Sequence, residues 1–193
     1  MNDVIVIGAG PAGALAATIL ARAKLSTLVI DADQGVTRRA FVPNLLGFPE
    51  GIPGPEIVAR GLQQLERAGA RLVRGKAKSL DRTGEGFVVV TDDGSRHEAR
   101  QVLLATGFAT DLARAAGVEV EPGTEPYVKE VVVVDREGRS SVPGIWAAGT
   151  VAGTSVHVAV TSGDGARVAI HLVSALRGER WVDHEVLQAE AAK

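Results

Sequence analysis

The chain has 193 residues, enough for one domain of ordinary size and too few for two full-sized ones. Apolar residues make up 46% and charged residues 23%, a balance that excludes a disordered or collagen-like chain. Lys and Arg number 21 against 23 Asp and Glu, with no long basic run, so we expect no nucleic-acid partner. The absence of cysteine excludes disulfides and thiolate chemistry, and any redox function therefore requires a bound cofactor.

An uncharged stretch near the start, Val4 to Leu20, has the length of a signal peptide or a short membrane segment. Asp3 stands where a signal peptide carries basic residues, and several glycines and a proline interrupt the stretch. We therefore expect no membrane association and a cytoplasmic location.

The first part of the chain predicts a βαβ unit. Val4–Ile7 is a short apolar run typical of a strand buried on both faces, Pro11–Ala23 is rich in Ala and Leu and predicts a helix, and Thr27–Asp31 predicts a second buried strand. Residues 34–54 contain several prolines and glycines without periodicity and predict a long loop.

The rest of the chain predicts alternating short strands and helices. The expected elements are a helix over Pro55–Ala68, strands over 71–74 and 77–80, a hairpin of Phe87–Thr91 and Ser95–Ala99, a strand over 102–105, a strand over Val131–Val134, a segment over 142–149 that re-enters the core, and a helix over about 158–176.

A Gly-x-Gly-x-x-Gly motif lies between the first strand and the first helix. Gly8 suits a tight turn, Gly10 lets the backbone approach a diphosphate, and Gly13 allows close packing of helix and strand. The N-terminus of the following helix would then hold the diphosphate without any basic residue. The motif therefore favours a dinucleotide site over a merely tight turn.

Asp31 ends the second strand at about the spacing, roughly 20 residues, at which an acid binds the ribose hydroxyls of an adenosine. Its charge would repel a 2′-phosphate, which favours NAD or FAD over NADP. The alternative is a surface acid at a strand end.

Several further motifs follow in order: Pro43-Asn44-Leu45-Leu46-Gly47-Phe48-Pro49, then Ala105-Thr106-Gly107, then Val142-Pro143-Gly144-Ile145-Trp146-Ala147-Ala148-Gly149. With the glycine motif and Asp31, this order resembles the FAD domain of thioredoxin reductases over nearly the whole chain. The chain is most similar to small, single-domain flavoproteins related to these enzymes. The resemblance implies an α/β, three-layer Rossmann-like FAD-binding domain over residues 1–193, with a mainly parallel sheet, helices on one face and a small β-meander over the other.

The resemblance also implies which residues contact FAD. Those expected at the diphosphate and the adenosine are Gly8, Gly10, Pro11, Ala12, Gly13, Asp31, Lys76, Ala77, Ala105, Thr106 and Gly107. Those expected along the ribityl chain and the flavin ring are Asn44, Gly149, Thr150, His157 and Val158. A helix N-terminus at His157 and Val158 would stabilise negative charge on the reduced flavin.

The chain departs from the family pattern at three points. Thr150 stands where the family has an aspartate that binds a ribityl hydroxyl. Residues 108–148 contain no second glycine motif, where full-length reductases insert a nicotinamide domain. The Cys-x-x-Cys pair of that domain has no counterpart, so disulfide reduction by this chain alone is chemically impossible.

These observations predict an oxidoreductase-type flavoprotein that transfers electrons through FAD between an unidentified donor and acceptor. A protein redox partner and a homodimer are expected, the homodimer because the apolar helix at the end of the chain would leave one face exposed. Two alternatives stay open, a non-catalytic FAD- or partner-binding module such as half of a split reductase, and an NAD-binding domain without flavin. The sequence identifies no catalytic residue and no metal site, since Asp183-His184-Glu185 reads as a solvated tail.

Overall fold

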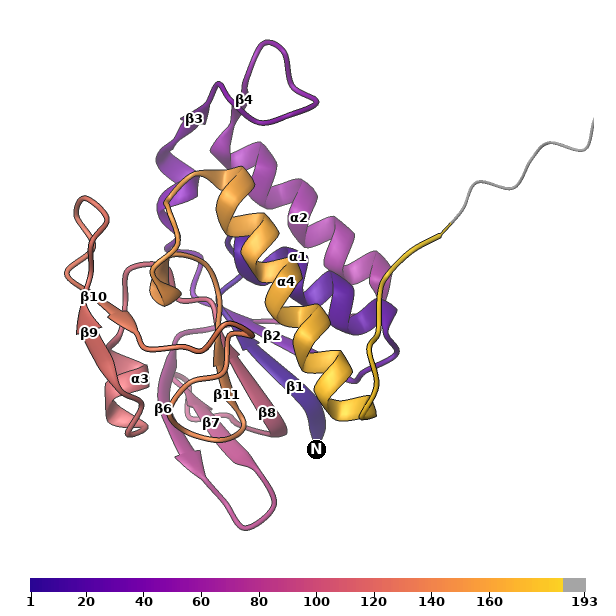
Figure 1. The fold of residues 1–193 in the computed structure, drawn as a ribbon, viewed down its shortest axis with the longest axis vertical. Coiled ribbons are helices and arrows are strands. Elements are labelled where there is room, and N and C mark those ends of the chain that lie inside the picture. Colours follow the sequence, from indigo (N-terminus) through magenta and orange to yellow (C-terminus); the bar gives the residue numbers. More distant parts are fainter. Residues whose placement is uncertain (186–193) are drawn as a thin grey trace, which may run out of the picture.

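A seven-stranded sheet forms the centre of the computed structural model, which describes residues 1–185 (Figure 1). Its strands follow the order β5-β2-β1-β8-β7-β6, and β11 also pairs with β8. Neighbours are parallel from β5 through β2 and β1 to β8 and β11, and antiparallel from β8 through β7 to β6. The strands are β1 Asn2–Ile7, β2 Thr27–Asp31, β5 Arg71–Arg74, β6 Ala77–Arg82, β7 Phe87–Thr91, β8 Arg96–Leu104 and β11 Ile145–Ala147.

Strand β1 is buried on both faces, as its unbroken apolar run predicts. Val4 and Val6 pack into the core that the sheet shares with the helices. Ile5 and Ile7 point to the opposite face and pack into a second core beneath the meander. Because side chains alternate along a strand, only a strand covered on both sides can place every residue of such a run away from water.

Three helices cover one face of the sheet: α1 (Pro11–Arg22), α2 (Gly54–Ala68) and α4 (Val158–Arg177) (Figure 1). Small residues let α1 and α4 approach closely, since a Cβ on Gly165 would lie 2.1 Å from the Ala12 carbonyl oxygen. Each of these helices begins within one residue of its predicted start. For α1 and α2 the reason is that proline and glycine mark the start in the sequence.

On the other face of the parallel strands lies the second core, to which the meander of β6, β7 and the first half of β8 contributes Leu80, Phe87 and Val89, and to which Ala113 and Val132 also belong. The predicted three-layer α/β fold is confirmed. The structure corrects one detail. The sequence predicts separate strands over 95–99 and 102–105, whereas residues 96–104 form the single strand β8. Its first half pairs with β7 and its second half lies between β1 and β11, so one strand joins the meander to the parallel sheet.

The segment predicted as an irregular loop over 34–54 contains some regular structure. Val36–Arg39 forms a short 3₁₀ helix, η1, and β3 (Phe41–Val42) pairs with β4 (Ile52–Pro53) to form a ribbon that projects from the top of the molecule in Figure 1. Strands of two residues have no periodicity from which they could be predicted.

Residues 108–142 contain two further elements and one corrected boundary. A short helix, α3 (Asp111–Ala115), was missed, and an antiparallel ribbon joins β9 (Val120–Pro122) to β10 (Glu130–Val132). The strand predicted over 131–134 is thus shorter and begins one residue earlier. Glu130 links β10 to α3, because its carboxylate accepts hydrogen bonds from the Arg114 guanidinium and the Thr110 hydroxyl. These bonds, that of Arg114 first, hold the pKa of Glu130 below its ordinary value.

The expected exposed apolar face of α4 is not present. Val168, Leu172 and Val173 are fully buried against α1 and the sheet, and Leu176 is the exposed large apolar side chain near the helix end. The apolar residues of α4 lie on more than one face of the helix because α4 packs on two sides within the same chain. Within residues 1–185 no helix combines the length and the apolarity needed to cross a bilayer.

Candidate functional site

The predicted nucleotide-binding residues gather at one edge of the sheet. Strands β1, β2, β8 and β11 are parallel, so the segments that follow them all leave the sheet at its carboxyl edge. The glycine motif, Ala105-Thr106-Gly107 and Gly149-Thr150 follow β1, β8 and β11, and Asp31 is the last residue of β2. In open α/β sheets this edge is where ligands bind.

The three glycines of the motif have different surroundings. Gly8 has φ +101°, and a Cβ there would lie 2.4 Å from the Ala105 carbonyl oxygen. A Cβ on Gly13 would lie 1.9 Å from the Gly8 carbonyl oxygen. A Cβ on Gly10 would meet no described atom within 4 Å. Gly8 and Gly13 are therefore required by the fold itself, whereas Gly10 borders open space.

The N-terminus of α1 has the properties of an anion site. Gly10 is its N-cap residue and Pro11 its first residue, and none of the described side chains caps it or places an acid in its first turn. The first amide N–H groups of a helix have no acceptor within the helix, and the helix dipole makes this end positive. An anion outside Gly10 would satisfy these donors without a basic side chain.

Asp31 lies beside this turn with its carboxylate already engaged. It is 8% exposed, and its Oδ1 accepts the Ala9 N–H at 3.0 Å. Its Oδ2 accepts from Arg74 at 2.7 Å, and Arg74 lies opposite Asp31 in the register of β5 and β2. Asp31 at this strand end is therefore a largely buried, paired carboxylate rather than a solvated one. The sequence did not reveal Arg74, whose positive charge also offsets the repulsion of a 2′-phosphate expected from Asp31 alone.

Lys76 and Ala77 occupy the turn into the meander. The sequence predicts both on a strand, but only Ala77 lies in β6, opposite Thr91. The backbone of Lys76 is fully paired with Asp92, since its N–H donates to Asp92 Oδ1 at 3.0 Å and its carbonyl accepts the Asp92 N–H at 2.9 Å.

The residues predicted near the flavin ring lie where the β3–β4 ribbon meets the start of α4. Asn44 is exposed in that ribbon's loop, and His157 is the exposed N-cap residue of α4, with Nδ1 2.7 Å from Ser155 Oγ. Val158 is buried with Val42 and Ile52, so α4 and the ribbon share a small apolar cluster. A cavity of about 270 Å³ lies nearby, lined by Gly10 and Pro11 together with residues of the ribbon loop, α2 and α4.

Gly149 and Thr150 begin the 3₁₀ turn η2 (Gly149–Ala152), and both are buried. The Gly149 N–H donates to Asp164 Oδ2 at 2.7 Å, and Asp164 Oδ1 is paired with Arg167 at 2.8 Å. Asp164, 8% exposed, therefore fixes this turn to α4. The sequence did not reveal this role, although an acid between Gly163 and Gly165 in an apolar helix was the available signal.

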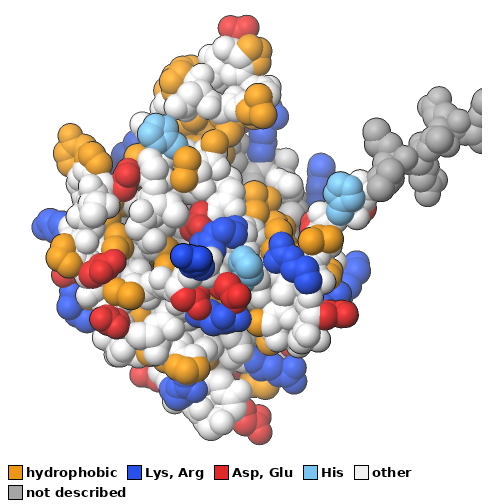
Figure 2. Space-filling view, in the orientation of Figure 1, with side chains coloured by type: hydrophobic (Ala, Val, Ile, Leu, Met, Phe, Trp, Pro, Cys, Tyr) orange, Lys and Arg blue, Asp and Glu red, His pale blue; other side chains and the backbone are white. Residues whose placement is uncertain are grey.

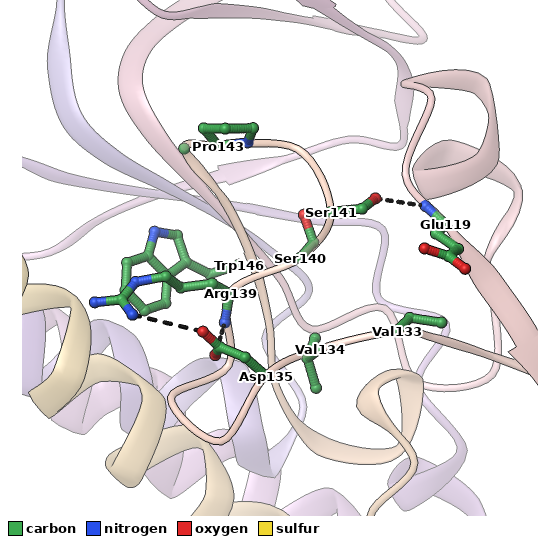
Figure 3. A pocket seen from close by; sticks show the side chains of 10 residues that line it. Glu119, Val133, Val134, Asp135, Arg139, Ser140, Ser141, Pro143 and Trp146 are labelled. Carbon is green, nitrogen blue, oxygen red and sulfur yellow. Dashed lines mark hydrogen bonds and ion pairs between the residues drawn. The ribbon is translucent and has the colours of Figure 1, made fainter.

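A larger hollow of about 610 Å³ lies elsewhere, around Trp146 and Arg139 (Figure 3). Its polar groups largely satisfy one another: the Arg139 guanidinium lies 5.2 Å from the Trp146 ring and pairs with Asp135, and Ser141 Oγ accepts the Glu119 N–H. None of the predicted site residues lines it, so its size does not make it the nucleotide site.

Comparison with known proteins identifies the family. The family model for pyridine nucleotide-disulphide oxidoreductases matches residues 2–107 and 53–166. Thioredoxin reductase from Streptomyces clavuligerus is 38% identical over 111 residues, which is 55% of this chain and 34% of that protein. Thioredoxin reductase from Mycolicibacterium smegmatis is 40% identical over 128 residues, 65% of this chain and 39% of that protein. The chain thus spans about a third of the length of these relatives.

Solved structures show the same fold. The atypical thioredoxin reductase TRi from Desulfovibrio vulgaris Hildenborough superposes with a TM-score of 0.82 at 20% identity, covering 93% of this chain and 99% of that one. A thioredoxin reductase from Gloeobacter violaceus gives 0.81 at 17% identity, covering 96% and 99%. The fold is the Rossmann-like α/β fold of the FAD-binding part of thioredoxin reductase. The chain belongs to the pyridine nucleotide-disulphide oxidoreductase family.

Proposed function

We propose that this chain binds FAD at the carboxyl edge of the parallel strands and serves as an oxidoreductase that passes electrons through it. The observation that carries the proposal is the uncapped N-terminus of α1, with Gly10 open to the outside and Asp31 fixed beside it. The diphosphate would take the free amides of α1, and Asp31 would accept the ribose hydroxyls. The implied single FAD-binding domain over residues 1–193 is part of this proposal.

The flavin ring would lie toward Asn44, His157 and Val158. FAD supplies the capacity to accept and release one or two electrons. The N-terminus of α4 would stabilise negative charge on the ring, since helix N-termini are positive. Asp164 holds the turn at Gly149 that would follow the ribityl chain, and buried Thr150 offers a hydroxyl in place of the family's aspartate.

The chain has no cysteine and so no redox-active disulfide. We therefore propose that electrons pass from FAD to an external acceptor. One candidate for this acceptor is a protein redox partner. A second candidate, half of a split reductase, is favoured by one observation: residues 108–142 fold as α3 and the small β9–β10 ribbon, with no second glycine motif. Turnover with NAD(P)H and an artificial acceptor distinguishes an enzyme from a module that only binds.

Nucleic acid remains an unfavoured partner. On the face shown in Figure 2, Lys and Arg side chains alternate with Asp and Glu, and no continuous basic surface is visible. A phosphate-tracking surface requires clustered positive charge.

Replacing Asp31 tests the adenosine end of the site. Asp31→Ala is expected to weaken FAD binding at least about tenfold, because each charge-assisted hydrogen bond contributes about 1.5–3 kcal/mol. Isothermal titration calorimetry measures the change. Asp81→Ala, which removes an exposed carboxylate on β6, is the matched control and should leave the affinity unchanged. An Asp31→Ala chain that binds FAD as tightly as the parent would remove Asp31 from the site.

A homodimer stays a prediction, now resting on other residues. Phe41 and Leu46 on the projecting ribbon are 62% and 97% exposed, and Val156 and Val160 are exposed at the start of α4. Exposed apolar side chains gathered in one region are typical of an interface. Light scattering should give the mass of two chains at micromolar concentration, and Leu46→Ser should lower it. A parent chain with the mass of one would contradict the prediction.

A further inference from the structure

The carboxyl ends of β2 and β5 carry a chain of alternating charges. Arg74 Nη1 lies 2.7 Å from Asp31 Oδ2 and 3.3 Å from Asp33 Oδ1, and Asp33 is also paired with Arg38. Two carboxylates and two guanidinium groups thus balance in charge. The register of the sheet brings Arg74 to this place, because Arg74 is the residue of β5 opposite Asp31.

We infer that Arg74 is a positioning residue for the adenosine end of the site, acting through Asp31. This inference rests on the proposed function, since it assigns Arg74 to the same nucleotide. Arg74 holds the Asp31 carboxylate from one side while the Ala9 N–H, part of the glycine motif, holds it from the other. The two contacts fix the carboxylate relative to the diphosphate end.

The acceptor capacity that remains on Asp31 matches a ribose. A carboxylate has about four lone-pair sites. Two are used, one on each oxygen, by Ala9 and Arg74. Two sites remain, one on each oxygen, for the pair of ribose hydroxyls. Arg74 can therefore stay in place while the ribose binds.

Arg74 also provides charge that the ligand needs. A nucleotide diphosphate is an anion, and it would approach Asp31, of which only a small part is exposed, and Asp33, which is about half exposed. Without Arg74 the two carboxylates would repel the ligand, and a largely buried carboxylate oxygen would lose its charged partner.

The test is a titration of FAD and of ADP into the parent chain and into Arg74→Gln. ADP carries the adenosine and the diphosphate but no flavin, so both ligands should weaken by the same factor of about ten. Arg71→Gln is the matched control, because Arg71 lies on the same strand but contacts Asn2 at the opposite end of the sheet. It should change either affinity by less than about twofold. Arg74→Lys keeps the charge but loses the planar fork and should recover part of the affinity.

Asp31→Asn separates positioning from a direct role. Asn keeps an oxygen for the Ala9 N–H. In this background Arg74→Gln should lower the FAD and ADP affinities by less than about twofold, because Arg74 acts through the carboxylate. The inference would be overturned if Arg74→Gln weakened binding as much in the Asp31→Asn background as in the parent. It would also be overturned if, in the parent background, Arg74→Gln weakened only FAD binding or left the ADP affinity unchanged. A parent chain that binds ADP but not FAD would refute the proposed function and leave the ADP series to decide on Arg74. A parent chain that binds neither would refute both.

Discussion

Gly13→Ala is expected to destabilise the fold by about 3 kcal/mol or more, because the added methyl group would overlap the neighbouring backbone. A Cβ at this position would lie 1.9 Å from the Gly8 carbonyl oxygen and 2.9 Å from the carbonyl carbon. Both are backbone atoms in the turn between β1 and α1, so no side chain can move aside. Relief would require α1 to shift away from the sheet. Urea denaturation followed by circular dichroism measures the free energy of unfolding.

Gly10→Ala is the matched control from the same motif. Gly10 has φ −67°, which any residue adopts, and a Cβ there meets no described atom within 4 Å. The unfolding free energy should therefore change by less than about 0.5 kcal/mol. FAD affinity should fall at least about tenfold, because the methyl group would occupy the space proposed for the diphosphate. Equal stability of the Gly13→Ala and parent chains would mean that helix and strand do not pack as described.

Flavin reduction by free NADH or NADPH is expected to be slow. Hydride transfer requires the nicotinamide held about 3–3.5 Å from the flavin, and such positioning supplies about 7–11 kcal/mol of the barrier reduction in well-oriented reactions. Residues 108–148 contain no second glycine motif that would bind the nicotinamide nucleotide. The productive geometry must therefore be reached by collision. Anaerobic stopped-flow mixing, followed by flavin absorbance, measures the rate.

Dithionite is the control for this experiment, since it needs no binding site and should bleach the flavin completely. Disulfide reductase activity toward thioredoxin should be undetectable, because the chain has no cysteine. Full reduction by NADH or NADPH within about a second at submillimolar concentration would contradict this prediction. It would show that the chain has a binding site that positions the nicotinamide against the flavin. Asn44 and His157, both exposed at the predicted ring end, would then be the first residues to replace.

The sequence predicted which segments of the candidate site lie together where this depends on local chain geometry. The glycine motif, the preceding apolar run and Asp31 lie within one βαβ unit, whose spacing determines where they meet. Helix α4 was predicted from its own residues, within one residue at each end. In each case the neighbouring residues in the chain are also the neighbours in space.

Arg74 and Asp164 could not be predicted in this way. Arg74 meets Asp31 only because β5 pairs with β2 in one particular register. Asp164 meets the Gly149 N–H only because α4 folds back beside the end of β11. Likewise the sequence predicted two strands where β8 is one, because its first half pairs with β7 in the meander and its second half lies in the parallel sheet. Such pairings depend on the whole fold.

The visible absorption spectrum of the purified chain tests the central claim most directly. The proposed function predicts bands near about 370 and about 450 nm, the spectrum of an oxidised flavin, and release of FAD, identified by mass, when the protein is denatured. A chain purified without colour should regain both bands after incubation with FAD and removal of the excess. A folded chain that stays colourless after this treatment would contradict FAD binding and would favour the NAD-binding alternative.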